Sequence, residues 1–231
     1  MKVVYAALVS LFAAGAMAQD CTFFFPQQEG TQLVRKGYDA TGHLKNVMTY
    51  KVDKVETMPS GTEVEAAYVY ADANGNPIVQ GELECSCQNG EFFMDMGDLV
   101  SYPAAISMID TDVAVTGDFM NYPNAFTSDM AGDNDYYFDD ANIKIYSKKN
   151  KKKRANVSIY DRVYETSEKV TTPAGTFDCA KVRYNLDVNS PEGRITGYGY
   201  EWYAPNVGVV RTEQYDPNNN LQSYTVLEEI N

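Results

Sequence analysis

The chain has 231 residues, of which 44% are hydrophobic, and it carries 32 Asp and Glu against 19 Lys and Arg, a formal net charge of −13. This composition is that of a globular protein and excludes a disordered or collagen-like chain. The acidic balance argues against nucleic acid as a partner, because the protein would repel a phosphate backbone.

The first 18 residues predict a secretory signal peptide, residues 1–18. Lys2 provides the positive start, an apolar run over residues 3–14 is too short to span a bilayer, and Ala16-Met17-Ala18 is typical of a cleavage site. We therefore expect an exported chain, residues 19–231, that forms a single β domain and has no transmembrane segment.

Cys21 is the first cysteine after the predicted cleavage site. Small apolar residues precede a lipidated cysteine, whereas Gln19 and Asp20 stand before Cys21. The sequence thus predicts a soluble protein of the periplasm or the extracellular space that is not a lipoprotein.

All four cysteines lie in the exported part, where disulfides form; they are Cys21, Cys85, Cys87 and Cys179. Cys85 and Cys87 would point to the same face of a strand, so a bond between them would distort that strand. We expect a long-range disulfide. A metal or redox site at these two residues would need a second pair of ligands, and His43 is the only histidine, so we expect no metal and no cofactor.

Alternation with a period of two dominates the exported chain and predicts half-buried antiparallel strands. Over 179–188, for example, Val182, Tyr184 and Leu186 share one face, while Lys181 and Arg183 share the other. Strands of this kind are predicted at 47–55, 63–70, 142–146, 156–164, 179–188, 194–203, 207–215 and 223–230. They predict an all-β fold with little helix, an antiparallel β-meander that forms a sandwich or a half-open barrel.

Three turns between these strands repeat one pattern, at 38–44, 70–78 and 215–221. Each follows a strand that ends near Tyr and uses Asp, Asn, Gly or Pro, residues that favour hairpin turns. Helix is expected only near 97–102, where Pro103 would end it.

Five aspartates crowd the segment 128–140, which we expect to be a solvated connection. They are Asp129, Asp133, Asp135, Asp139 and Asp140. The segment is also the candidate junction if the domain consists of two sheet-forming halves. Calcium is the alternative interpretation, but the glycine and distal glutamate of a calcium loop are missing at the required positions.

Six basic residues fall within seven positions; they are Lys148, Lys149, Lys151, Lys152, Lys153 and Arg154. Two hypotheses remain open for this run. It is either a contact with an anionic surface, such as acidic lipid headgroups or a polyanionic glycan, or a solvated hairpin tip between the strands at 142–146 and 156–164.

Tyr198, Tyr200 and Trp202 alternate along one predicted strand and so line one of its faces. This face is a candidate ligand-binding surface, either a platform for a sugar or the wall of an apolar groove. Packing against the core or across strands is the alternative, because aromatic residues also favour strands.

No catalytic residues are predicted. A hydrolytic triad needs a base, and His43 stands in a turn without a Gly-x-Ser-x-Gly motif elsewhere in the chain. No glycine-rich phosphate loop is found. A carboxylate pair for glycoside cleavage stays open among the 32 acids.

Residues 171–179, Thr-Thr-Pro-Ala-Gly-Thr-Phe-Asp-Cys, precede a second motif at 201–213, Glu-Trp-Tyr-Ala-Pro-Asn-Val-Gly-Val-Val-Arg-Thr-Glu. In this order the two motifs resemble the DUF3108-like family of exported proteins common in Bacteroidota, and the segments 21–26 and 87–96 are similar to that family too. The resemblance implies antiparallel sheets in a sandwich or half-open barrel, similar to envelope folds that include lipid and lipoprotein carriers. It implies no catalytic residue.

We therefore expect an exported protein of the cell envelope that binds or scaffolds an unknown protein, glycan or lipid without transforming it. The alternative is a carrier whose curved sheet shelters an acyl chain or another apolar ligand, with Tyr198, Tyr200 and Trp202 on its wall. A hydrolase with paired carboxylates is a third hypothesis.

Overall fold

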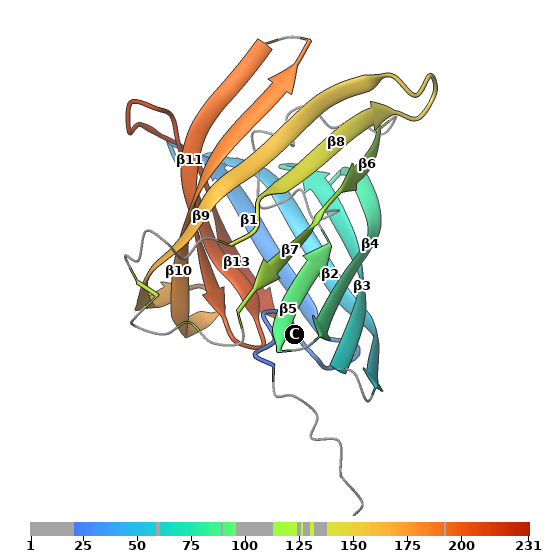
Figure 1. The fold of residues 1–231 in the computed structure, drawn as a ribbon, viewed down its shortest axis with the longest axis vertical. Coiled ribbons are helices and arrows are strands. Elements are labelled where there is room, and N and C mark those ends of the chain that lie inside the picture. The colour runs from blue at the N-terminus through green and yellow to red at the C-terminus, as the bar shows by residue number, and fades with distance from the viewer. Residues whose placement is uncertain are drawn as a thin grey trace, which may run out of the picture.

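The protein is a single curled antiparallel sheet (Figure 1). The computed structural model describes residues 21–58, 61–88, 90–95, 113–123, 126, 130–131, 138–191 and 193–231. No residue in these ranges is helical. The predicted signal peptide and the predicted helix at 97–102 lie outside the described residues, as does most of the acidic segment 128–140.

Thirteen strands make up the sheet. Their bounds are β1 Gln32–Asp39, β2 Leu44–Met58, β3 Gly61–Asp72, β4 Pro77–Gln88, β5 Glu91–Asp95, β6 Val113–Gly117, β7 Phe119–Tyr122, β8 Ala141–Ser147, β9 Lys153–Thr172, β10 Gly175–Ser190, β11 Gly193–Ala204, β12 Gly208–Tyr215 and β13 Leu221–Ile230. All eight predicted segments lie in these strands, with 207–215 starting one residue early, and the expected all-β, barrel-like fold is confirmed.

The strand order is β6-β8-β9-β10-β11-β12-β13-β1-β2-β3-β4-β5-β7, and every neighbouring pair is antiparallel. The two strands at the edges, β6 and β7, are consecutive in the chain and are separated only by Asp118. One short segment, 113–122, therefore pairs with β8 at its start and with β5 at its end. The sheet thus closes almost completely into a barrel.

Two hydrogen bonds hold the chain where it passes from one edge to the other. The Asn142 backbone N–H donates to the Asp118 carboxylate at 2.9 Å. The Asp118 N–H donates to the Asn142 carbonyl at 3.2 Å. We refer to this crossing as the seam.

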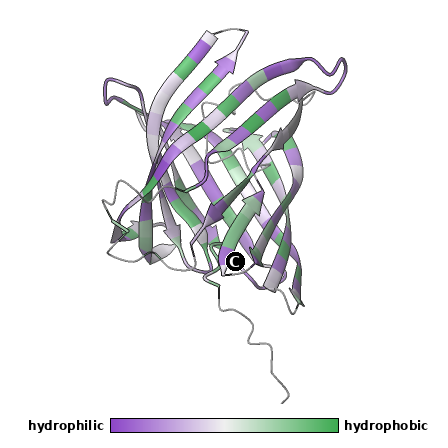
Figure 2. Ribbon diagram, viewed as in Figure 1, coloured by the Kyte–Doolittle hydropathy of each residue, from purple (hydrophilic) through white to green (hydrophobic). Residues whose placement is uncertain are grey.

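The strands form because each has one apolar face for the interior of the barrel (Figure 2). On β10, Val182, Tyr184 and Leu186 are at most 4% exposed, whereas Lys181 and Arg183 between them are only partly buried. Burial of the apolar face is the main force that curls the sheet.

The two ends of the barrel differ. Because neighbouring strands are antiparallel, the turns at 39–43, 72–76, 148–152, 191–192 and 216–220 share one end, which we name the mouth. The turns at 173–174 and 205–207 and the described start of the chain share the other, plugged end (Figure 1).

Phe23, Phe24 and Phe25 close the plugged end, and each is only 1% exposed. The Phe24 ring lies 5.4–6.0 Å from four other rings, those of Phe92, Tyr122, Phe126 and Tyr203. A disulfide between Cys21 and Cys87 and a 2.7 Å hydrogen bond from the Asn206 N–H to the Phe23 carbonyl tie this segment to the barrel.

The disulfide links cysteines 66 residues apart, as expected of a long-range bridge. Cys85 and Cys179 are buried and lie outside it. Burial raises the pKa of the Cys179 thiol to about 12, so this thiol stays protonated at neutral pH.

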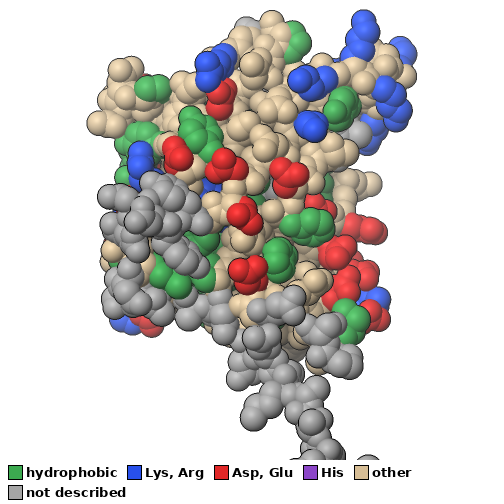
Figure 3. Space-filling model, viewed as in Figure 1, with side chains coloured by type: hydrophobic (Ala, Val, Ile, Leu, Met, Phe, Trp, Pro, Cys, Tyr) green, Lys and Arg blue, Asp and Glu red, His purple; other side chains and the backbone are tan. Residues whose placement is uncertain are grey.

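Charge is unevenly spread over the surface. Carboxylates are scattered across the face drawn in Figure 3, while Lys and Arg gather at the upper corner, where the hairpin of β8 and β9 projects.

We predict that Phe24→Ala lowers the free energy of unfolding by about 3–5 kcal/mol, because it leaves a cavity among four rings. Urea unfolding followed by circular dichroism measures this. The matched control is Phe119→Ala, since the Phe119 ring is 49% exposed and its loss should change stability little. Equal losses for the two variants would contradict a plug that stabilises the barrel.

Candidate functional site

A cavity of about 530 Å³ opens at the mouth of the barrel. It lies between the upper parts of β1, β2 and β3 on one side and β10, β11 and β12 on the other, with β13 between β12 and β1. Its lining residues are Gly37, Tyr38, Asp39, Lys45, Asn46, Tyr70, Leu186, Ile195, Thr196, Gly197, Tyr198, Gln214, Tyr215, Asp216, Gln222 and Ser223.

The walls of the cavity are mainly apolar. Leu186 pairs with Gly197 and Val188 with Ile195, so the Ile195 side chain shares the inward face of the sheet with Leu186. Ile195 is nevertheless 44% exposed, because it lies at the open end. An exposed aliphatic side chain on the inner wall of an open barrel is available for contact with a ligand.

Two glycines let bulky polar side chains pack across the inner face. A Cβ on Gly37 would lie 2.8 Å from the Asn46 Cγ, and one on Gly199 would meet the Tyr184 ring and the Glu213 carbonyl. Any larger residue at these positions would displace Asn46 or Tyr184. Asn46 lines the cavity, and Tyr184 lies buried below its floor.

The floor of the cavity consists of neutral hydrogen-bonding groups. Gln214 Nε2 donates to the Tyr184 hydroxyl at 3.4 Å. Burial raises the pKa of Tyr70 to about 12, against a small opposing effect of its hydrogen bond with Asn46. Burial, and then the nearby Glu201 charge, raises the pKa of Tyr184 well above its usual value. Both phenols are therefore protonated and uncharged at physiological pH.

A polar network lies deeper in the barrel, and none of its members lines the mouth cavity. The Tyr203 hydroxyl donates to Glu201 Oε2 at 2.6 Å and is also hydrogen-bonded to the Tyr122 hydroxyl. The Arg162 guanidinium lies 4.7 Å from the centre of the Tyr122 ring. Glu201, Tyr203, Tyr122 and Arg162 are at most 1% exposed, so this network fills the interior of the barrel.

Arg162 also fastens the seam. Its Nη1 donates to the backbone carbonyls of Asn121, on β7, and Asp139, at 3.4 and 3.2 Å. Its guanidinium lies 5.2 Å from the centre of the Phe138 ring. The sequence analysis did not single out Arg162, whose burial depends on a bulge at Asp161, a residue with a φ of 50°.

Three turns at the mouth share one hydrogen-bond pattern, as the recurring sequence pattern predicts. In each, one carboxylate oxygen accepts the backbone N–H groups two and four residues further along the chain, at 2.8–3.0 Å; the carboxylates belong to Asp39, Asp72 and Asp216. Asp39 and Asp216 line the mouth cavity. These carboxylates thus fix the rim, and their hydrogen bonds lower the pKa of each.

His43 lies in the first of these turns and is not placed as a catalytic base. Its Nδ1 is 2.8 Å from the Thr41 hydroxyl and 3.6 Å from Asp39 Oδ2. In a catalytic triad, one ring nitrogen of the histidine contacts the nucleophile and the other contacts the acid. In this turn, Nδ1 alone faces both the Thr41 hydroxyl and the Asp39 carboxylate. The described residues also contain no group of three or more His, Cys, Asp or Glu placed to hold a metal.

The structure places Tyr198, Tyr200 and Trp202 on the outer face of β11, opposite Gly199, Glu201 and Tyr203. Tyr198 stacks on Tyr215, with ring centres 5.2 Å apart. Among the three, only Tyr198 contributes to the lining of the mouth cavity.

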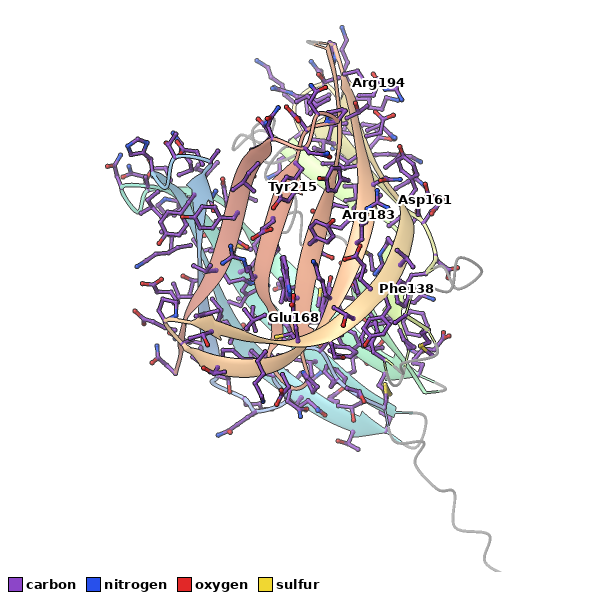
Figure 4. The ribbon with its side chains drawn as sticks, turned by 90° about the vertical axis from the view of Figure 1, so that its left-hand side faces the viewer. Phe138, Asp161, Glu168, Arg183, Arg194 and Tyr215 are labelled. Atoms are coloured by element: carbon purple, nitrogen blue, oxygen red, sulfur yellow. A yellow bond between two sulfur atoms is a disulfide. The ribbon has the colours of Figure 1, made fainter. Side chains whose placement is uncertain are left out.

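Cations from neighbouring strands cover this outer aromatic row (Figure 4). The Lys181 ammonium lies 4.1 Å from the centre of the Tyr200 ring, and the Arg183 guanidinium lies 5.4 Å from that of Tyr198. Trp202 Nε1 donates to Glu168 at 2.5 Å, and Trp202 is only 6% exposed. The row therefore packs against other side chains of the same sheet.

The structure places the six clustered basic residues on the hairpin of β8 and β9, where Lys153 and Arg154 begin β9. They lie away from the lining of the mouth cavity. No helix in the described part of the chain is long and apolar enough to cross a membrane.

A nearly closed antiparallel barrel with one plugged end and one open end defines an all-β, barrel-like class of protein. Within it, the chain belongs to the DUF3108-like family, whose model matches residues 28–227. This confirms the resemblance found in the two sequence motifs.

Two solved structures are similar to this chain. A candidate lipoprotein from Parabacteroides distasonis is 58% identical, with a TM-score of 0.86, over 92% of this chain and 100% of that one. A candidate exported protein with a YmcC-like fold from Bacteroides fragilis is 49% identical, with a TM-score of 0.86, over 91% of this chain and 100% of that one. No curated protein matches the chain.

The prediction that the chain is not a lipoprotein is wrong. The Parabacteroides distasonis protein, 58% identical to it, is a candidate lipoprotein by its name. The prediction depended on Gln19 and Asp20 alone. The enzymes that process an exported chain recognise the residues before a lipidated cysteine directly. The folding and packing of the chain therefore do not constrain these residues.

We predict that the turn at 216–220 stabilises the protein only while Asp216 is ionised. Hydrogen bonds from the Asn220 side chain and from the Asn220 and Asn218 N–H groups lower the pKa of Asp216 below its ordinary value of 3.8. A lowered pKa adds stability above the unfolded-state pKa, and this stability is lost as the pH falls through the folded-state pKa.

The stability difference between the native protein and Asp216→Ala should therefore be constant from pH 7 to about pH 5 and shrink below about pH 4. Denaturant unfolding at a series of pH values measures it. Asp178→Ala is the matched control, because Asp178 is an exposed carboxylate that pairs with the Lys169 ammonium at 2.6 Å. A difference that grows on acidification would contradict the role of the ionised carboxylate.

Proposed function

We propose that this protein is an exported, non-catalytic binding protein of the cell envelope that holds the apolar part of an uncharged small ligand in the mouth cavity. The observation that carries the proposal is the mouth cavity of about 530 Å³, which has the more apolar lining and opens at the end of the barrel opposite Phe23, Phe24 and Phe25. A second pocket of about 480 Å³ lies beside Phe24 at the plugged end, where charged side chains of Glu168, Lys169 and Asp178 line it.

The size and lining of the cavity support binding of a small molecule. Ligand sites in proteins commonly measure about 300–1,000 Å³ and combine apolar walls with a few convergent polar groups. Leu186, Ile195 and the Tyr70 ring offer apolar surface, while the amides of Asn46 and Gln214 offer donors and acceptors. Such a site suits a ligand with an aliphatic or ring portion and a neutral polar group.

The depth of the cavity limits what it accepts. Tyr184, Tyr203 and Tyr122 are fully buried below the floor, so the centre of the barrel is filled by side chains. A long acyl chain would have to displace them at the cost of their packing. We therefore propose a ligand that enters only the mouth, in place of an acyl chain buried along the axis of the barrel.

We also propose that the protein does not transform the ligand that it binds. Protonated phenols and amides line the floor, and neither transfers a proton readily near neutral pH. The carboxylates of Asp39 and Asp216 at the rim already accept two backbone N–H groups each. These features support binding without transformation.

A scaffold without a small ligand is the second candidate, and the filled interior of the barrel favours it. Native mass spectrometry of the protein, purified gently from an exporting Gram-negative host, distinguishes the two functions. A reproducible mass released on unfolding would support ligand binding. A clean mass of the unliganded protein would overturn the ligand-binding function and favour the scaffold.

We predict that Ile195→Arg reduces the occupancy of the released ligand by at least about tenfold, because it places a charge and extra volume in an apolar wall. Occupancy is measured by the same mass spectrometry. Ile230→Arg is the matched control, since Ile230 is 38% exposed, against 44% for Ile195, and lies at the plugged end of the barrel. Equal loss from both variants would place the ligand elsewhere.

A further inference from the structure

The hairpin of β8 and β9 has a charge opposite to that of the rest of the chain. Residues 141–160 contain seven Lys or Arg and no Asp or Glu, whereas the whole chain has a formal net charge of −13, so the remainder carries −20. Five lysines near the tip are exposed; they are Lys148, Lys149, Lys151, Lys152 and Lys153. Figure 3 shows the resulting group of cations at the corner of the molecule.

Hydrogen bonds of the backbone and of the Asn150 side chain hold the turn at the tip, and none of these bonds involves a lysine side chain. The Lys151 N–H donates to the Ser147 carbonyl, and the Ser147 N–H donates to the Lys152 carbonyl, both at 2.9 Å. The Lys152 N–H donates to Asn150 Oδ1 at 3.0 Å. No described carboxylate pairs with any of the five lysines. Their charges are therefore presented to solvent on a rigid support.

The chemistry of the tip favours an extended anionic surface over a single bound anion. A buried arginine fork recognises one phosphate by geometry, whereas flexible, hydrated lysine ammonium groups act as a field of point charges. The lysines line neither the mouth cavity nor the two pockets at the plugged end. A field of this kind gains affinity by displacing the counterions of a densely charged partner.

The position of the hairpin decides between a flat partner and a long polymer. The hairpin projects at the mouth end, near the tip of β10 and β11 (Figure 1). A flat surface would meet these projecting tips only. A long polyanion would extend from the hairpin over the rest of the protein, whose net charge of −20 would repel it.

We propose that the β8–β9 hairpin docks the protein on an anionic lipid surface with the mouth of the barrel turned toward the bilayer. The proposal is independent of the ligand cavity, because the lysines lie outside its lining and docking needs no ligand.

The test measures binding of the purified protein to phosphatidylglycerol–phosphatidylcholine vesicles by sedimentation. Each lysine near a charged membrane contributes a factor of about five. Neutralising three of them, Lys148→Gln, Lys149→Gln and Lys151→Gln together, should therefore weaken binding about a hundredfold. Binding of the native protein should also weaken as salt is raised.

The matched control neutralises three lysines elsewhere, Lys51→Gln, Lys54→Gln and Lys169→Gln, which are 45–71% exposed and change the net charge equally. This variant should bind like the native protein. Equal loss from both triple variants would overturn the proposal, because net charge would then explain the effect. Absence of binding to the vesicles, or binding to soluble dextran sulfate but not to vesicles, would overturn it too.

Hydrogen exchange tests the proposed orientation of the docked protein, with the mouth of the barrel toward the bilayer. Hydrogen exchange on vesicles should slow at the turn 148–152 and at the tip around Arg194, and should stay unchanged at the turn 173–174 of the plugged end. Protection confined to the plugged end would contradict the orientation.

Discussion

Closure of the barrel depends on one short segment that pairs with both edges of the sheet. Strands β6 and β7 follow each other with one residue between them, yet they hydrogen-bond to β8 and β5, which are otherwise far apart in the sheet order. Arg162 stabilises this crossing by donating to a carbonyl of β7 from within the barrel. Without the crossing, the sheet would have two long exposed edges, which promote aggregation.

The mouth cavity lies above the filled centre of the barrel, and a second pocket of about 480 Å³ lies beside Phe24 and Tyr203 at the plugged end. The polar network of Arg162, Tyr122, Tyr203 and Glu201 spans the interior from the seam to β11, and the phenylalanines of the plug pack beneath it. Gly37 and Gly197 line the walls of the upper part, where the Asn46 side chain and the Tyr215 carbonyl take the places that their Cβ atoms would fill. The filled centre and the open mouth are thus two consequences of where the bulky inward side chains are placed.

The sequence was sufficient for the all-β fold class and for eight of the thirteen strands, but not for the choice between a sandwich and a barrel or for the buried polar groups. Alternation along β10 shows its inward face directly, because Val182, Tyr184 and Leu186 are apolar and their neighbours are not. On β9 the bulge at Asp161 changes which face points inward, so Arg162 is buried while Val163 is only partly buried. A bulge depends on pairing with neighbouring strands, and a single strand sequence does not reveal it.

The orientation of β11 illustrates the same difficulty for the site. Tyr198, Tyr200 and Trp202 form the more hydrophobic face of the strand, yet they lie outside, and Gly199 and Glu201 lie inside. The reason is on the next strand, because Tyr184 of β10 occupies the space above Gly199. Pairwise packing across strands thus determines which face is the core. The cavity combines residues from seven strands and could not be assembled from local patterns.

The pairing of β1 with β13 has a consequence for how the protein is made. The first and last strands of the barrel are neighbours, so contacts between Leu33 and Ile230 form only once the whole chain is present. A protein synthesised from its N-terminus cannot complete such a sheet while its C-terminal strand is still missing. The topology thereby delays the native state until synthesis of the chain has ended. It also predicts slow folding, since contacts distant in sequence dominate the barrel.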